Sequence, residues 1–369
     1  MPQHNVTPTA GNIDSAENSR KRGTPMNFES RRHAVADLAE AMELCFTKGW
    51  TDGLPVIPPS TESVTAMLQA TGVEPKQQIA FIENRQVSVT AEKVAINAVL
   101  AGCKPEYMPV VVAAVEAMAD PLYNYHGPAT STGGSAVFMV VNGPIARELG
   151  MNSGDNLFGP GWRPNATIGR AVRLVMRNTI GTMPGTLDRS SLGHAGKYSF
   201  CIAENEADSP WPPFHVSRGF RPEQSVVTVF AALAPHQFSN GLSSTPEGIL
   251  DTACAHMRIS AGSGRRPQYA LVFAGEHSAV MKKAGWSRED VQRYCFEHSR
   301  ASVAELKRAN LMPGVVTPDD EQRTSTLVET PQDFLVLSAG GRAGVQSAFV
   351  PGWGAKTGSQ SVSRLIRRS

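Results

Sequence analysis

Two cysteines stand at positions where a thiol could act as a nucleophile. Cys103 follows a glycine and precedes Pro105, a residue suited to the first turn of a helix. The unpaired N–H groups at a helix start favour the thiolate, and the adjacent Lys104 adds a positive charge. We therefore expect Cys103 to be reactive; the alternative is a structural thiol in a turn between two helices.

Cys201 is the second candidate nucleophile. The alternation of residues 197–203 predicts a strand on which Lys197, Ser199 and Cys201 share the polar face, with apolar side chains opposite. Alternate residues on a strand lie ~6–7 Å apart, close enough for Lys197 to bias Cys201 towards the thiolate. The alternative is an ordinary strand whose far side is solvated.

Groups able to transfer protons flank this expected strand. Glu204 and Glu206 follow it, and His194 precedes it in a turn flanked by glycines. A strand that leads into a carboxylate-rich loop is a common way to build a site. The groups at the two strand ends would lie more than ~20 Å apart, so Glu204 is a better partner for the Cys201 thiol than His194. The predicted catalytic residues are Cys103, Cys201, Lys197, Glu204 and His194.

A glycine-rich loop at 152–165 resembles an anion cradle. The backbone N–H groups of such a loop, and the start of the helix expected at 166–178, attract negative charge. Arg163 has the planar fork that suits a carboxylate or phosphate, and Asn165 is a good helix cap. We expect Arg163, Asn165 and Glu206 to bind substrate. The loop has neither the Walker A sequence nor the dinucleotide-binding fingerprint, and the alternative is a purely structural loop.

The histidines and cysteines are scattered and give no metal-ligand spacing. The sequence has no HxxxH, HExxH or CxxC pattern, so we predict no metal site. It also lacks a Gly-x-Ser-x-Gly motif, which disfavours a Ser-His-Asp hydrolase. No motif identifies a cofactor.

Helical and strand patterns alternate along the chain. This alternation predicts an α/β fold, with a mixed or mostly parallel sheet covered by helices and joined by long loops rich in glycine and proline. A short similarity between 271–275 and 335–340 fits two strands that deliver their loops to one edge. The expected helices are 33–48, 60–72, 90–101, 105–118, 166–178, 244–257 and one that begins at Ser287; the expected strands are 86–89, 136–141, 197–203, 225–233, 268–274 and 333–338.

The composition predicts a soluble globular protein. Of the 369 residues, 41% are hydrophobic and 18% charged, which excludes a mainly disordered chain. The net charge of +2 gives no sign of binding to nucleic acid or to an anionic membrane. No apolar run is long enough to cross a membrane. The five cysteines are widely spaced, which indicates free thiols in a reducing, cytoplasmic compartment.

The distribution of residue types divides the chain into three parts. Residues 1–27 lack apolar periodicity and are expected to be disordered, with Met26 as a candidate start. Residues 28–353 form the α/β body, in which a boundary between two subdomains is expected near 205–225. Residues 354–369 carry basic side chains and no acidic ones, and we expect a solvated or subunit-contacting tail, or alternatively an anion-binding arm.

Four motifs together resemble a bacterial protein family associated with UGSC-type (seleno)proteins. The resemblance extends from about Trp50 to Trp353. It implies a small thiol or selenol partner protein, whose own Cys-Gly-Ser-Cys motif is absent from this chain. The motifs are KGWTDGLPVIPP at 48–59, AGCKPEYMPV at 101–110, FGPGWR at 158–163 and GKYSFCIAENE at 196–206.

Two functions follow from these residues and from the resemblance. The first is a cysteine-dependent enzyme that acts on a small anionic metabolite, by thiol redox chemistry or cleavage of a carbon–heteroatom bond, together with the partner protein. The second is a non-catalytic subunit that binds a ligand or a partner peptide. In either case we expect a homo- or hetero-oligomer.

Overall fold

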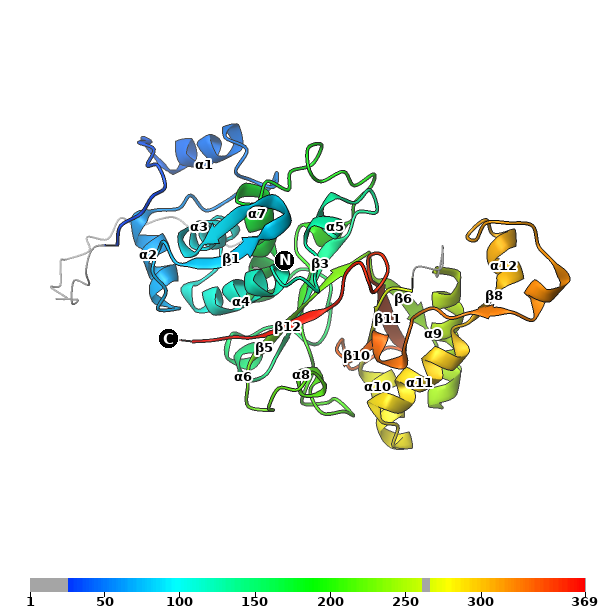
Figure 1. The fold of residues 1–369 in the computed structure, drawn as a ribbon. Helices are drawn as coiled ribbons and strands as arrows, with labels where there is room; N and C mark the ends of the chain where they lie inside the picture. Colours follow the sequence, from blue (N-terminus) through cyan, green and yellow to red (C-terminus); the bar gives the residue numbers. More distant parts are fainter. Residues whose placement is uncertain (1–25, 261–265, 369) are drawn as a thin grey trace, which may run out of the picture.

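Two four-stranded sheets pack face to face and carry helices on their outer faces, which gives four layers (Figure 1). The computed structural model describes residues 26–260 and 266–368. The first sheet has the order β12-β5-β3-β4 and the second the order β10-β7-β11-β6. The strands are β3 (Ala136–Asn142), β4 (Cys201–Ala203), β5 (Val226–Ala232), β12 (Val362–Leu365), β6 (His236–Ser239), β7 (Tyr269–Phe273), β10 (Phe334–Ser338) and β11 (Gln346–Pro351).

Both sheets mix parallel and antiparallel pairs. Strands β3 and β4 run parallel, as do β7 and β10, while the other pairs within these sheets are antiparallel. The expectation of an α/β protein with mixed strand pairing is therefore confirmed, but the strands form two sheets and not the single sheet that the sequence predicted. The parallel pairing of β7 with β10 also agrees with the similarity between 271–275 and 335–340, because both strands end at the same edge.

The sheets are apolar on both faces because each face is covered. In β3, Phe138 and Val140 point into the core between the sheets, whereas Met139 and Val141 point into the core beneath the helices. Strands buried on both faces have near-continuous apolar sequences, as β3 does.

Helices cover the outer face of each sheet, and these two groups of helices lie at the left and at the right of Figure 1. Over the first sheet and its rim lie α1 (Leu38–Thr47), α2 (Thr61–Gln69), α3 (Ala91–Ala101), α4 (Met108–Met118), α5 (His126–Thr130), α6 (Pro144–Glu148), α7 (Arg163–Asn178) and α8 (Phe214–Ser217). Over or beside the second lie α9 (Pro246–Ser260), α10 (Gly275–Ala284), α11 (Arg288–His298) and α12 (Val303–Arg308). Short pairs join β1 (Gln78–Ile82) to β2 (Val87–Thr90) and β8 (Ala301–Ser302) to β9 (Thr324–Ser325).

Helix α7 lies against the first sheet and is fixed near its middle by the contacts of two adjacent residues, Gly169 and Arg170. Arg170 donates to both carboxylate oxygens of Asp52 at 2.8 and 2.7 Å and to the carbonyls of Leu54 and Pro55. At Gly169 the helix approaches the segment before β4 so closely that a Cβ atom would lie 2.4 Å from Ser199 Oγ. The absence of a side chain at Gly169 therefore sets the distance between helix and sheet.

The boundary expected near 205–225 is displaced. The chain completes β5 in the first sheet before it enters the second at β6, so the crossing lies at about residue 233. The chain then returns: Trp353 N donates to Ala231 O at 2.8 Å, and β12 joins the first sheet. The first sheet therefore contains strands from both ends of the chain, and no single boundary in the sequence separates the two sheets.

The C-terminal segment is not a solvated tail, contrary to expectation. Its residues 362–365 form β12, which pairs antiparallel with β5. Its basic side chains form ion pairs: Arg364 with Asp120 and Lys356 with Asp333. These contacts leave little support for an anion-binding arm.

The first described residues, from Met26 onward, belong to the body. Met26 and Phe28 pack against the core beneath the helices. Nearly all of the segment expected to be disordered, 1–27, lies outside the described residues.

We predict that Gly169→Ala destabilises the protein by ~1–3 kcal/mol, although the same change in an open helix stabilises it. The new Cβ would overlap Ser199 Oγ and would also lie 3.0 Å from the backbone N of Phe200. Urea unfolding measures the cost, and adding Ser199→Ala should recover part of it. A stabilised single variant would contradict the close packing.

Candidate functional site

The carboxyl ends of parallel strands from both sheets meet at one place. Asn142 ends β3, and Glu204 follows β4 in the matching register. The next residue, Asn205, donates its backbone N–H to Ser338 O at the end of β10, at 2.8 Å. In open α/β sheets, ligands bind beyond the carboxyl ends of the strands, so this junction is the first place to look for a site.

Glu204 is buried at this junction and incompletely hydrogen-bonded. Its Oε2 accepts from Asn142 Nδ2 and from the backbone N of Phe214, both at 2.6 Å. Its Oε1 has no hydrogen-bond partner among the described residues, although Arg288 Nη2 lies 3.6 Å away. A buried carboxylate oxygen without a donor costs free energy of folding, and such groups in native structures often have a functional role.

Burial raises the pKa of Glu204 to about 7, even though Arg288 and the two hydrogen-bond donors oppose the shift. The neighbouring Glu206 adds to it. A carboxyl group poised near neutral pH can both give and take a proton, which is the property that general acid–base catalysis requires.

A second carboxylate and a histidine lie beside Glu204. Glu206 Oε1 accepts from Asn142 Nδ2 at 3.0 Å and from Gly143 N at 2.7 Å. His215 is fully buried, and its Nε2 lies 3.1 Å from Arg221 O, so Nε2 carries the hydrogen. Its Nδ1 lies 3.8 Å from Glu206 Oε1 and makes no hydrogen bond. We call Asn142, Glu204, Glu206, His215 and Arg288 the Glu204 cluster.

Arg288 connects the Glu204 cluster to a hollow of about 400 Å³. Its guanidinium lies 5.8 Å from the centre of the Trp211 ring and donates to Pro212 O at 2.8 Å. Trp286 and Lys282 also line the hollow. The hollow therefore offers aromatic surface and a net positive lining, and Arg288 is the residue through which it reaches Glu204, which does not itself line the hollow.

The expected thiolate at Cys103 is not present. The Cys103 side chain is buried, and its Sγ donates to Thr167 O at 3.3 Å. Burial raises the pKa of Cys103 to about 12. Pro105 opens a 3₁₀ turn, Pro105–Tyr107, that leads directly into α4, but burial of the thiol beneath α7 outweighs any effect of this helix start.

Cys201 is buried as well, and the polar strand face proposed for it does not form. The strand contains only Cys201–Ala203, while Lys197 lies in a 3₁₀ turn and its ammonium is used elsewhere. Burial raises the pKa of Cys201, and a charge on Cys103 would raise it further. The two thiols are thus neighbours beneath α7, neither of them exposed.

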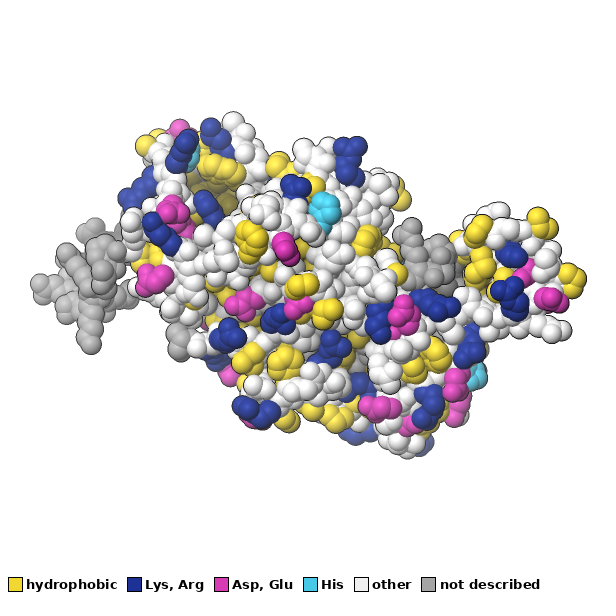
Figure 2. Space-filling view, viewed as in Figure 1, with side chains coloured by type: hydrophobic (Ala, Val, Ile, Leu, Met, Phe, Trp, Pro, Cys, Tyr) yellow, Lys and Arg dark blue, Asp and Glu magenta, His cyan; other side chains and the backbone are white. Residues whose placement is uncertain are grey.

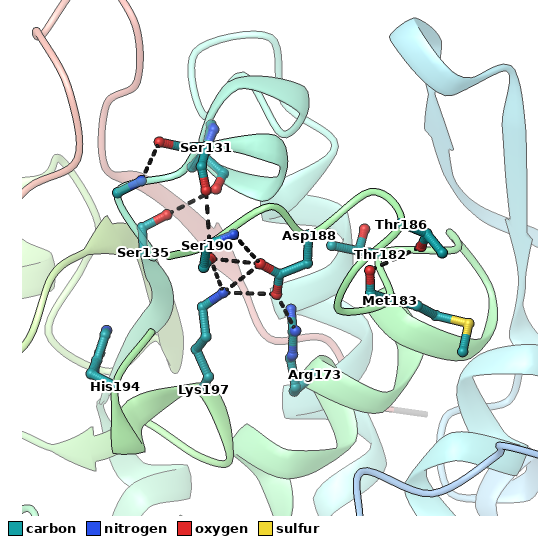
Figure 3. Close-up of polar contacts among 12 residues, drawn as sticks. Ser131, Ser135, Arg173, Thr182, Met183, Thr186, Asp188, Ser190, His194 and Lys197 are labelled. Atoms are coloured by element: carbon teal, nitrogen blue, oxygen red, sulfur yellow. Dashed lines mark hydrogen bonds and ion pairs between the residues drawn. The ribbon is translucent and has the colours of Figure 1, made fainter. Parts of the chain in front are cut away.

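Lys197 belongs to a separate cluster around Asp188 (Figure 3). Its Nζ lies 2.9 and 2.7 Å from the two carboxylate oxygens of Asp188 and 2.5 Å from Ser190 Oγ. Arg173 of α7 donates to the same carboxylate at 2.7 Å. Burial opposes ionisation of Asp188, but the bonds from Lys197, Ser190 and Arg173 outweigh it and hold the pKa of Asp188 well below its usual range.

In the Asp188 cluster, formed by Asp188, Lys197, Ser190 and Arg173, both carboxylate oxygens of Asp188 are hydrogen-bonded. The cluster holds the loop before β4 against α7. Asp188 is too weak a base, and Lys197 too fully paired, to exchange protons with a substrate. His194 lies apart from them in Figure 3. Its ring packs edge-on to Phe200, and burial lowers the pKa of His194.

Arg163 and Asn165 bind backbone groups of the protein itself. Arg163 donates to Gly102 O at 3.0 and 2.8 Å. The Asn165 side chain exchanges hydrogen bonds with the backbone of Asn152 and donates to Cys201 O at 3.2 Å. Asn165 lies inside the first turn of α7, which begins at Arg163, and does not cap it. Two of the three residues predicted to bind substrate, Arg163 and Asn165, therefore stabilise the scaffold.

Of the predicted site residues, the structure brings Glu204 together with Glu206, and Cys103 together with Cys201. Sequence analysis missed Asn142, His215 and Arg288 as partners of the two glutamates. Asn142 had a usable signal, since it is the polar residue that ends a buried strand. Arg288 comes from the second half of the chain, and no local pattern relates it to Glu204.

A scan against protein-family models and a search of curated proteins each find no match to this chain. Among the described residues, no helix is both long and apolar enough to cross a membrane. In the same residues, no three His, Cys, Asp or Glu side chains gather in a group able to hold a metal ion.

We predict that the stability of the protein falls between pH 5 and pH 8 through Glu204. Its folded pKa, about 7, exceeds the ordinary value of 4.5, so the native state binds this proton more tightly than the unfolded state. The free energy of unfolding should therefore drop by ~3 kcal/mol as pH rises through this range. Glu204→Gln removes this contribution and should gain stability relative to the wild type as pH rises. Urea unfolding at four pH values, with the exposed Glu83→Gln as control, measures the difference; parallel curves for wild type and Glu204→Gln would refute the shift.

We also predict that Asp188→Asn costs ~3–5 kcal/mol, because it leaves Arg173 and Lys197 partly buried without their counter-charge. Lys197→Met should cost less, since the Arg173–Asp188 pair remains. Thermal unfolding ranks the two variants. The reverse order would show that Lys197, and not Asp188, holds the cluster together.

Proposed function

We propose that this protein is an enzyme that cleaves a carbon–heteroatom bond in a small anionic metabolite by general acid–base chemistry at the Glu204 cluster. The observation that carries the proposal is the unpaired, buried Oε1 of Glu204, on a carboxyl group with a pKa of about 7. Structural carboxylates are normally paired on both oxygens, whereas a catalytic one keeps an oxygen for its substrate.

The charge around the hollow favours an anionic substrate. Arg288 and Lys282 line it together with one carboxylate, Glu289, so two cations face one anion, and the aromatic rings of Trp211 and Trp286 offer apolar contact. A substrate carboxylate paired with Arg288 would bring its reacting carbon towards Glu204 Oε1, because the guanidinium already lies 3.6 Å from that oxygen.

The reaction needs two proton-transfer groups, and the cluster supplies them. Ionised Glu204 takes the proton from carbon, the C–H electrons form a double bond, and the heteroatom departs with the bonding pair. The proton for the leaving heteroatom comes from the pair Glu206 and His215, whose nearest atoms, Oε1 and Nδ1, lie 3.8 Å apart. The step is an elimination and requires no oxidant or reductant.

A comparison of metabolite consumption tests this function. Purified wild type, Glu204→Gln and Glu83→Gln are each incubated with a small-molecule extract of bacterial cells and followed by mass spectrometry. We expect an anionic compound to disappear with wild type and Glu83→Gln only, with a rate that changes around pH 7. Equal consumption by Glu204→Gln would refute the proposal, and a compound bound but never consumed would favour a non-catalytic binding subunit.

A second candidate is the cysteine-dependent reaction with a small thiol or selenol partner, and the proximity of Cys103 to Cys201 favours it. Both thiols contact α7, so they would become reactive only when that helix moves. In the same experiment, a reaction lost in Cys201→Ser and retained in Glu204→Gln would support this candidate over the first.

A further inference from the structure

A second, larger hollow lies on the helical side of the molecule, where α1, α2, α3 and the end of α7 meet. Its volume is about 720 Å³, within the range of ~300–1,000 Å³ typical of small-molecule sites. None of the Glu204 cluster residues lines it. Figure 2 shows it at the upper left as a recess with hydrophobic side chains inside and Lys and Arg around it.

The floor of this hollow is apolar. Cys45, Val64 and Leu100 are buried beneath it, and Trp50 and Ile96 form its sides. Helix α1 covers it loosely, since Cys45 is the only buried residue of that helix, and Leu38 is 66% exposed. A ligand could therefore bury an apolar body here without displacing a well-packed element.

The rim of the hollow carries excess positive charge. Its cations are Arg31, Arg32, His33 when protonated, Lys48 and Lys93.

Two acidic residues, Glu62 and Glu92, line the hollow, and the Glu92 carboxylate is already hydrogen-bonded within the protein. The Glu92 carboxylate accepts the backbone N–H groups of Glu29 and Ser30 at 2.9 and 2.8 Å. Within the described residues, Arg31 and Lys48 form no ion pair. These two exposed cations, above an apolar floor, lack a negative partner.

We propose that this hollow binds a free carboxylate that carries an apolar chain, with the chain against Cys45, Val64 and Leu100 and the carboxylate between Arg31 and Lys48. Charge complementarity argues for this occupant. The chain's own N-terminal segment is a poorer occupant, because the sequence before Met26 includes Arg20, Lys21 and Arg22, which repeat the positive charge of the rim.

Calorimetric titration with straight-chain carboxylates of four to ten carbons, on the full chain, tests the proposal. We expect binding to tighten by about fourfold per added methylene, the factor for removing one CH₂ from water. The alcohol and amine of the same chain length should bind at least tenfold more weakly than the carboxylate. The double variant Arg31→Ala/Lys48→Ala should lose the same factor, whereas Lys283→Ala, an exposed lysine on α10, should bind like the wild type.

Three results would overturn the proposal: no dependence on chain length, equal binding of carboxylate and amine, or equal losses in the double variant and in Lys283→Ala. The Glu204→Gln variant separates this site from the proposed catalytic one. It should bind the carboxylates like the wild type, whether or not the Glu204 cluster is catalytic.

Discussion

The packing of the two sheets against each other is the constraint on which the other features depend. It removes the inner faces of β3, β4, β7 and β10 from water and brings the carboxyl ends of both parallel pairs to one dry junction. Polar groups that follow those strands are then buried whether or not they find partners. The raised pKa of Glu204 is a consequence of this packing, because exposure to water would return the carboxyl group to its ordinary titration.

Helix α7 contacts or contains residues of all four sequence motifs. Asp52 of the first motif binds Arg170, and Gly102 of the second accepts from Arg163, which belongs to the third. In the fourth, Cys201 O accepts from Asn165. Residues of these motifs therefore form the hydrogen bonds and the ion pair that hold one helix against three loops and a strand. Motifs rich in glycine, cysteine and arginine can arise from assembly requirements alone, without any contact to substrate.

The sequence was informative where structure is local. The capping box at Ser287 and Asp290 and the apolar run of β3 predicted their elements closely. The pattern failed at 197–203, where apparent alternation was outweighed by the pairing of Lys197 with Asp188, a contact fixed by tertiary structure. Glu204 was found because it follows a buried strand. Its partner Arg288 was not found, because the two residues are 84 positions apart and no local sequence pattern indicates a contact at that separation.

Strand β12 has a consequence for the order of assembly. It pairs with β5 across the 129 intervening residues 233–361, which include all of the second sheet. While the polypeptide emerges from the ribosome, β5 remains an open sheet edge until residues 362–365 have been made, and open edges invite pairing with other chains. The second sheet, whose strands lie between β5 and β12, can meanwhile form and shield one face of the first. Early formation of the second sheet would protect that face of the first sheet from contact with other chains.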